Sequence, residues 1–261
     1  MNVLVERRQL AAWITLDRAE KRNALSPDML RALDTAIDEA LSDEGARSIV
    51  VTGSGTAFCA GADLELGREL ASTPGRNPFA AVLDKLQSSP KPVIAAVNGA
   101  AFGGGLGLIA AADVAIASKD AVFSFSEVRL GLIPAMISVF VLPKIGPHHA
   151  RRLFTTGRRF DANEALTIGL LHELVDGESL ESVVAAECDE ISRGGPGAVA
   201  AAKRLVFEIP GLDLAKGLDE ALDHASALFA ERVASDEGRE GMAAFREKRS
   251  PSWVRQGSDR S

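Results

Sequence analysis

Short apolar segments alternate with helix-length spacers through the first half of the chain. Residues 48–52 (SIVVT) and 92–97 (PVIAAV) are mostly apolar and rich in β-branched side chains, the pattern of a strand buried on both faces. Shorter apolar runs at 114–117 and 122–125 repeat it. Strands of this kind, when helix-length segments separate them, pair in parallel. The sequence therefore predicts an α/β fold with a mostly parallel sheet.

Caps and periodicity indicate further elements near the N-terminus. Residues 2–7 and 11–17 predict a hairpin. Ser26 followed by Pro27 predicts the start of a helix, since serine is a preferred N-cap and proline a preferred first helical residue. A glycine-rich stretch at 104–112 predicts another helix.

The C-terminal third has a different character. Its one extended stretch is expected at 172–175. Helical spacing recurs at 161–168, 178–192, 196–208, 213–235 and 236–247. Residues 67–79 (GRELASTPGRNPF) predict one long loop. We therefore expect an α/β core over 1–195 and a helical C-terminal region over 196–261.

Charge and composition exclude several classes of protein. The net charge is −7, from 29 basic and 36 acidic residues, which argues against a nucleic-acid partner because such a partner calls for a basic face. The two cysteines and four histidines lack the spacing of a metal site, and the cysteines fit a reducing compartment. The longest apolar stretch, 93–117, is interrupted by Asn98, Asp113 and glycines, so no membrane span is expected. With no signal-peptide pattern at the start, a cytoplasmic protein is expected.

The glycine run NGAAFGGGLGL at 98–108 has the strongest chemical implication. Three glycines that enter a helix expose N–H groups at the positive end of the helix dipole, which suits an anion or a developing oxyanion. Leu108 falls where the third glycine of GxGxxG would lie, and no Gly-Lys-Ser/Thr occurs, so the nucleotide patterns do not fit. The alternative is that these glycines only allow close helix–sheet packing.

Two further segments are candidates for a site. AFCAGADL at 57–64 follows a predicted strand, and its small residues would let a ligand approach the backbone. A tight packing loop is the alternative. In FSFSEVRLGLIP at 123–134, Glu127 lies among apolar residues, a setting that raises a carboxyl pKa and favours acid–base work. A solvated cap or a surface ion pair is the alternative for that residue.

Taken together, these segments resemble the crotonase superfamily, the enoyl-CoA hydratase/isomerase group, over nearly the whole chain. The matching blocks are NAL at 23–25, FCAGADL at 58–64, AAVNGAAFGGG at 95–105, SEVRLGLIP at 126–134 and EGMAAFREKRSPSW at 240–253. The resemblance implies a spiral of repeated ββα units with a helical C-terminal trimerisation region. It also implies a homotrimer or a dimer of trimers.

The resemblance also implies roles for individual residues. Glu127 would be the catalytic carboxylate, and the N–H groups of Ala62 and Gly104 would form an oxyanion hole for the thioester carbonyl. Residues that would bind the acyl-CoA substrate are Arg22, Ala24, Ala60, Gly61, Asp63, Leu64, Gly103, Phe245 and Lys248. Phe245 and Lys248 would act from a neighbouring subunit. The CoA belongs to the substrate, and neither a separate cofactor nor a metal is implied.

One position departs from the family pattern. Hydratases of this group usually carry a first glutamate where this chain has Gly107. A single carboxylate is enough to move a double bond from the 3 to the 2 position, which favours isomerisation. Hydration is the commoner activity of the group, and Glu127 alone could deliver both elements of water. Hydration of a 2-enoyl-CoA to a 3-hydroxyacyl-CoA is therefore the first hypothesis. A 3,2-enoyl-CoA isomerase and a non-catalytic acyl-CoA-binding protein are the alternatives.

Three other acidic residues are expected to be structural. Asp113 is expected to cap or pair after a helix, and Asp161 is expected to cap a helix that has Glu164 at its third position.

Overall fold

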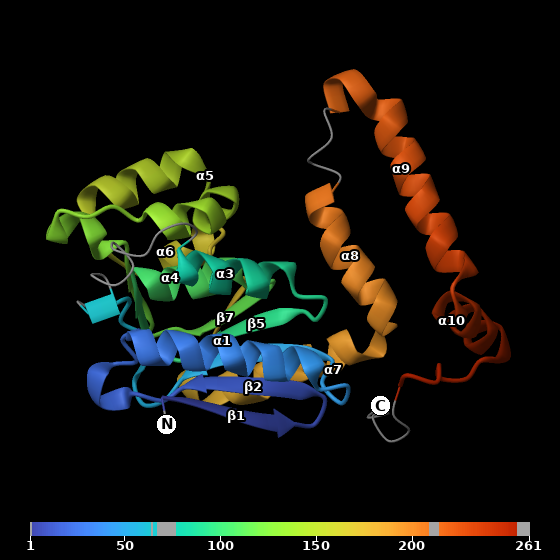
Figure 1. The fold of residues 1–261 in the computed structure, drawn as a ribbon, viewed down its shortest axis with the longest axis horizontal. Helices are drawn as coiled ribbons and strands as arrows, with labels where there is room; N and C mark the ends of the chain where they lie inside the picture. Colours follow the sequence, from blue (N-terminus) through green and yellow to red (C-terminus); the bar gives the residue numbers. More distant parts are fainter. Residues whose placement is uncertain (1, 64, 67–76, 209–213, 255–261) are drawn as a thin grey trace.

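The computed structural model describes residues 2–63, 65–66, 77–208 and 214–254. Strands and helices are interspersed through the first two thirds, up to β10, and the helices α7 to α10 follow (Figure 1). The strands are β1 (Val3–Arg8), β2 (Ala11–Leu16), β3 (Ser48–Gly53), β4 (Ala57–Cys59), β5 (Val93–Val97), β6 (Ala100–Phe102), β7 (Val114–Ser118), β8 (Val122–Ser124), β9 (Arg159–Asp161) and β10 (Glu173–Val175). The α-helices are α1 (Pro27–Ser42), α3 (Pro78–Ser88), α4 (Gly104–Ala111), α5 (Ala135–Thr156), α6 (Ala162–Thr167), α7 (Leu180–Arg193), α8 (Pro196–Glu208), α9 (Leu214–Ala234) and α10 (Asp236–Glu247). Short 3-10 helices are η1 (Ala19–Lys21), η2 (Ser126–Leu130) and η3 (Gly177–Ser179).

Two sheets organise the core. The larger sheet has the order β1-β2-β3-β5-β7-β10 and is parallel except for β1, which pairs antiparallel with β2. The smaller sheet has the order β4-β6-β8-β9 and is parallel except for β9. The predicted α/β class and the predicted N-terminal hairpin are therefore confirmed.

The inner strands of the larger sheet, β2, β3, β5 and β7, are buried on both faces, which explains their unbroken apolar runs. In β3, Ile49 and Val51 enter the main core with α1, whereas Val50 enters a second cluster on the other face. There α7 contributes Val184 and Cys188. Since neighbouring residues of a strand point to opposite faces, each strand of this kind supplies both cores.

Helix α1 begins as its sequence predicts. Ser26 is extended, and its hydroxyl accepts the Met29 N–H at 3.2 Å, with Pro27 as the first helical residue. The helices predicted in the C-terminal third are present as α6 to α10, and the extended stretch is β10.

The sequence pattern did not reveal α3, α5 or the short strands β4, β6 and β9. Helix α3 begins at Pro78, capped by Asn77, so the long loop predicted over 67–79 extends too far, and residues 67–76 lie outside the described residues. Helix α5 bends at Gly146, where the backbone φ is 68°, and contains Pro143 and Pro147. These prolines interrupt the helical pattern, so the spacing of apolar residues did not predict this helix.

Helices α8 to α10 form an arm that extends beside the α/β core (Figure 1). Lys203 of α8 connects this arm to the core, where its ammonium lies 2.7 Å from Asp113. Among the described residues no helix is both long and apolar enough to cross a bilayer. The division at residue 195 stays a prediction.

Candidate functional site

Three loops meet at one edge of the smaller sheet. The strands β4, β6 and β8 run parallel, with Cys59 opposite Ala101 and Phe102 opposite Ser124. Their carboxyl ends therefore lie side by side, and the loops that follow hold the three segments singled out from the sequence.

Two glycines bring these loops into contact. Gly61 has φ 90° and Gly103 has φ 49°, values that side chains disfavour. A Cβ added at Gly61 would lie 2.9 Å from the carbonyl oxygen of Phe102 and 3.5 Å from the amide nitrogen of Gly104. One added at Gly103 would lie 3.3 Å from Oε1 of Glu127. The glycines thus let two backbone segments and one carboxylate approach the same point.

The amides of Ala62 and Gly104 are the two predicted oxyanion-hole donors, and their segments meet where Gly61 approaches the Gly104 nitrogen. Leu25 donates its N–H to the Gly61 carbonyl at 2.8 Å and accepts the Asp63 N–H at 2.9 Å. Successive amides of an extended segment point in opposite directions, so the Ala62 N–H faces away from Leu25. The Gly104 N–H belongs to the first turn of α4, where no intrahelical acceptor exists. Within the described part of the chain, neither amide has a backbone acceptor.

Apolar side chains pack against the Cα of Gly104. A Cβ at Gly104 would lie 3.2 Å from Cζ of Phe79 and 3.3 Å from Cδ1 of Leu25. Phe79, at the start of α3, is a wall residue that the sequence pattern did not indicate. Apolar walls of this kind lower the local dielectric, and a low dielectric strengthens a hydrogen bond from an amide to a developing negative charge.

Glu127 lies in η2, directly after β8, and is half-buried. Its Oε2 atom is buried and has no hydrogen-bond partner among the described residues. Burial raises the pKa of the Glu127 carboxyl, and a hydrogen bond from its own backbone opposes this rise. An unpartnered buried carboxyl oxygen beside two unpartnered amides can exchange a proton with a bound molecule.

Gly107 has no room for a side chain. A Cβ there would lie 2.5 Å from Cγ2 of Ile137 and 3.2 Å from Cδ1 of Leu83. Ile137 of α5 therefore occupies the space in which a side chain from position 107 would begin. A carboxylate side chain at position 107 would therefore require Ile137 to move.

The remaining predicted substrate residues of the N-terminal half lie near this edge. Arg22 is exposed and Ala24 half-buried, and the Arg22 carbonyl accepts the Ala60 N–H at 2.9 Å. The carboxylate of Asp63 pairs with Arg18 at 3.1 Å, so its charge already has a partner. Leu64 lies outside the described residues.

Phe245 and Lys248 are not brought to this edge within one chain. Both belong to the end of α10, and Figure 1 places α10 on the opposite side of the molecule from α4. Phe245 is 85% exposed. Their predicted role at a neighbour's site stays a prediction.

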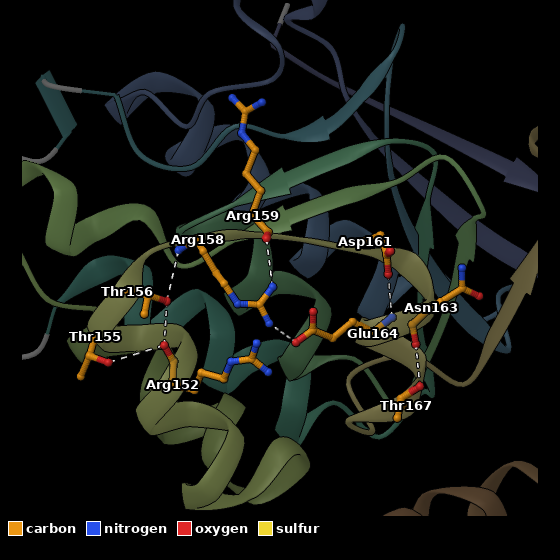
Figure 2. Close-up of polar contacts among 9 residues, drawn as sticks. All are labelled: Arg152, Thr155, Thr156, Arg158, Arg159, Asp161, Asn163, Glu164 and Thr167. Atoms are coloured by element: carbon orange, nitrogen blue, oxygen red, sulfur yellow. Dashed lines mark hydrogen bonds and ion pairs between the residues drawn. The ribbon is translucent and has the colours of Figure 1, made fainter.

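The other acidic residues have structural partners. Asp113 pairs with Lys203 and accepts the Val93 N–H at 2.7 Å. Asp161 caps α6 by accepting the Glu164 N–H at 2.8 Å, and Glu164 turns away to form an ion pair with Arg158 (Figure 2). No group of His, Cys, Asp and Glu suited to a metal ion occurs among the described residues.

Comparisons with known proteins show the family of this chain. The sequence model of the enoyl-CoA hydratase/isomerase family matches residues 6–256. A short-chain-enoyl-CoA hydratase of Clostridium acetobutylicum is 34% identical over 254 residues, 95% of each chain. A carnitinyl-CoA dehydratase of Proteus mirabilis is 35% identical over 245 residues, 92% of this chain and 93% of the relative.

Solved structures show the same fold. The crystal structure of an enoyl-CoA hydratase from Shewanella pealeana matches with a TM-score of 0.89 at 35% identity, over 97% of this chain and 96% of that one. This likeness confirms the predicted crotonase-like α/β class. The family model, the similar sequences and the shared fold lead to one conclusion. The chain belongs to the enoyl-CoA hydratase/isomerase family.

Proposed function

We propose that this protein hydrates a 2-enoyl-CoA to a 3-hydroxyacyl-CoA, with Glu127 as the sole catalytic carboxylate. The observation that supports this most is the buried, unpartnered Oε2 of Glu127 beside the two free amides of Ala62 and Gly104. The thioester carbonyl accepts both N–H groups, and the negative charge that develops on its oxygen is held there.

The proton steps follow from one carboxylate. Glu127 takes a proton from water as the water oxygen bonds to C3 of the enoyl group, and the electron pair of the double bond passes through C2 to the thioester oxygen. The carbonyl then re-forms as C2 takes the proton back from Glu127. The raised pKa of Glu127 makes its carboxylate a stronger base toward water, and the carboxylic acid formed in that step returns its proton to the more basic C2 carbon of the enolate.

A 3,2-enoyl-CoA isomerase is the second candidate, and Gly107 favours it. Isomerisation needs one group that removes a proton from C2 and returns it to C4, and Ile137 fills the place where a second carboxylate would begin.

Purified protein is tested on crotonyl-CoA, 3-hexenoyl-CoA and 3-methylglutaconyl-CoA. Incorporation of oxygen from labelled water at C3 supports hydration. Return of a substrate proton from C2 to C4 of 3-hexenoyl-CoA supports isomerisation instead. Binding of all three thioesters without turnover would identify a non-catalytic acyl-CoA-binding protein.

The same proposal includes the oligomeric state, the cellular location and the cofactor requirement of the protein. The protein forms a homotrimer or a dimer of trimers through its helical C-terminal region, works in the cytoplasm and needs no cofactor beyond the CoA of its substrate. Exposed apolar side chains on α8 to α10 support the assembly, since a helix face of this kind is stabilised when a partner covers it.

A further inference from the structure

The segment that supplies Ala62 is held by a neighbouring loop, residues 22–25. The two run side by side as an isolated parallel pairing of Leu25 with Ala62, through the backbone hydrogen bonds described above. The direction of the Ala62 N–H therefore depends on where residues 22–25 lie.

Asn23 anchors that loop. The residue is fully buried and has φ 55°, a left-handed conformation that asparagine tolerates better than most residues. Its Nδ2 donates to the carbonyls of Ala57 at 2.7 Å and Ser54 at 2.9 Å, and its Oδ1 accepts the Arg18 N–H at 2.9 Å. One side chain thus joins the loop to the start of β4, the strand that leads to Ala62.

A second connection fixes the far end of the same segment. The Arg18 guanidinium donates to Oδ2 of Asp63 at 3.1 Å and to the Ala24 carbonyl at 3.2 Å. Residues 58–62, which lie between the two anchored residues, are thereby held at both ends, by Asn23 through Ala57 and by Arg18 through Asp63.

We propose that Asn23 is a positioning residue that sets the orientation of the Ala62 N–H in the oxyanion hole. The inference rests on the proposed function. Asn23 acts through the backbone of residues 22–25 and does not touch the thioester itself.

This role predicts a loss in turnover that exceeds the loss in binding. The oxyanion hydrogen bond is strongest when charge develops, so a misdirected donor lowers kcat more than it raises KM. Complete removal of such a donor costs about 100-fold to 1,000-fold in kcat, so reorienting it should cost about tenfold to 100-fold.

The test compares Asn23→Gly with Asn23→Ala in the full-length protein. Glycine keeps the left-handed backbone accessible and removes only the side-chain hydrogen bonds, whereas alanine also strains the backbone. For both, kcat and KM are measured on crotonyl-CoA. Infrared spectroscopy then follows the stretch of a ¹³C-labelled thioester carbonyl in the bound state, since this frequency falls when the oxygen accepts hydrogen bonds.

Both variants are expected to lose kcat by about tenfold to 100-fold with a smaller change in KM. The bound carbonyl frequency should move toward its value in solution. Ser26→Ala is the matched control, because it removes a neighbouring buried hydrogen bond, the α1 cap to Met29, without touching Ala57 or the Ala62 segment. It should lower the melting temperature and keep both kcat and the carbonyl frequency.

The outcomes separate this inference from the proposed function. If the wild-type protein turns over crotonyl-CoA and shifts its carbonyl, but Asn23→Gly behaves like wild type, the positioning role is wrong. The same conclusion follows if Ser26→Ala loses as much kcat as Asn23→Gly. If the wild-type protein neither turns over the thioester panel nor shifts a carbonyl, the proposed function itself fails.

Discussion

At the scale of single residues, the proposed site combines one titratable side chain with two backbone donors. Glu127 gains its chemical character from burial, which raises its pKa, and from the lack of a partner for Oε2 within the described residues. The donors are fixed by the glycines at 61 and 103, whose backbone angles a larger residue would strain.

Glu127→Gln is expected to lower kcat by about 100-fold to 10,000-fold, because glutamine keeps the size of the side chain but cannot accept a proton. Binding of a thioester should survive, since the amides of Ala62 and Gly104 are unaffected. Steady-state kinetics and calorimetry with acetoacetyl-CoA measure the two effects. A wild-type rate in this variant would require another base.

The same substitution should stabilise the fold near neutral pH. The native pKa of Glu127 lies above its ordinary value of 4.5, so ionisation favours the unfolded chain as the pH rises through this window. Below about pH 4 the carboxyl is protonated in both states and contributes nothing. Urea unfolding from pH 4 to 8 should therefore show a Glu127→Gln advantage that grows with pH. An advantage that is equal at all pH values would contradict this cause.

Gly107 and Ile137 should be energetically coupled. Gly107→Ala forces a Cβ against Cγ2 of Ile137, and overpacking of this kind costs about 1–3 kcal/mol of unfolding free energy. Ile137→Ala alone leaves a cavity and costs about 2–5 kcal/mol. The double variant should be less destabilised than the sum of the two single variants. Additive losses in a denaturation cycle would show that the two side chains do not compete for space.

At the scale of elements, most of those with a clear local signal could be predicted from the sequence, with α3 the exception. The cap at Ser26, the apolar run of β3 and the glycines before α4 all act within a few residues, so each element could be located from the sequence. Strands β4, β6 and β9 have three residues each, too few to show a period. Helix α5 is interrupted by prolines.

The candidate site could also be predicted only in part. Its sequence motifs could be recognised, whereas two of the apolar residues that contact it could not. Phe79 and Ile137 reach the site from α3 and α5, two helices that the sequence analysis did not place. For α3 the Asn77 cap, Pro78 and the apolar spacing of residues 79–86 were a usable local signal that the loop prediction overlooked. Only tertiary packing brings the two side chains to the site.

The junction between α8 and α10 depends on one carboxylate. Glu237 accepts the N–H groups of Gly197 at 2.8 Å and Ala198 at 2.7 Å, so it caps the start of α8 and complements the helix dipole. Glu237→Gln should lower the unfolding free energy by about 0.5–2 kcal/mol, as loss of a helix cap does. Limited proteolysis should then cut the arm sooner.

Glu231→Gln on α9 removes the same charge from an exposed position that pairs with its sequence neighbour Arg232. It should leave both readouts unchanged, because exposed ion pairs contribute little. Equal losses in the two variants would mean that net charge, and not the cap, is responsible.

At the scale of the whole molecule, the arm of α8 to α10 presents apolar side chains that the core does not cover. Phe229 is 72% exposed and borders a hollow of about 240 Å³ between α8 and α9. An apolar surface of this kind on an extended arm is consistent with the proposed assembly.

Phe229→Glu should therefore reduce the mass seen in sedimentation equilibrium, because a buried charge without a partner disfavours an apolar interface. Leu4→Glu, at an exposed apolar position on β1, is the control and should leave the assembly intact. If both variants sediment like the wild type, the Phe229 face is not an interface. Full activity in a monomer would also contradict the role of Phe245 and Lys248 at a neighbour's site.

Two of the three groups at the proposed site belong to the main chain, and this affects how the protein can change over generations. A codon change can replace Glu127 at once, but no codon change deletes the N–H of Ala62 or Gly104 unless it introduces proline. Mutation can therefore change the proton transfers that follow thioester binding more readily than it can remove the two hydrogen bonds to the thioester carbonyl. Descendants of such a chain would be expected to diversify in the proton transfers they perform while they continue to recognise the same carbonyl.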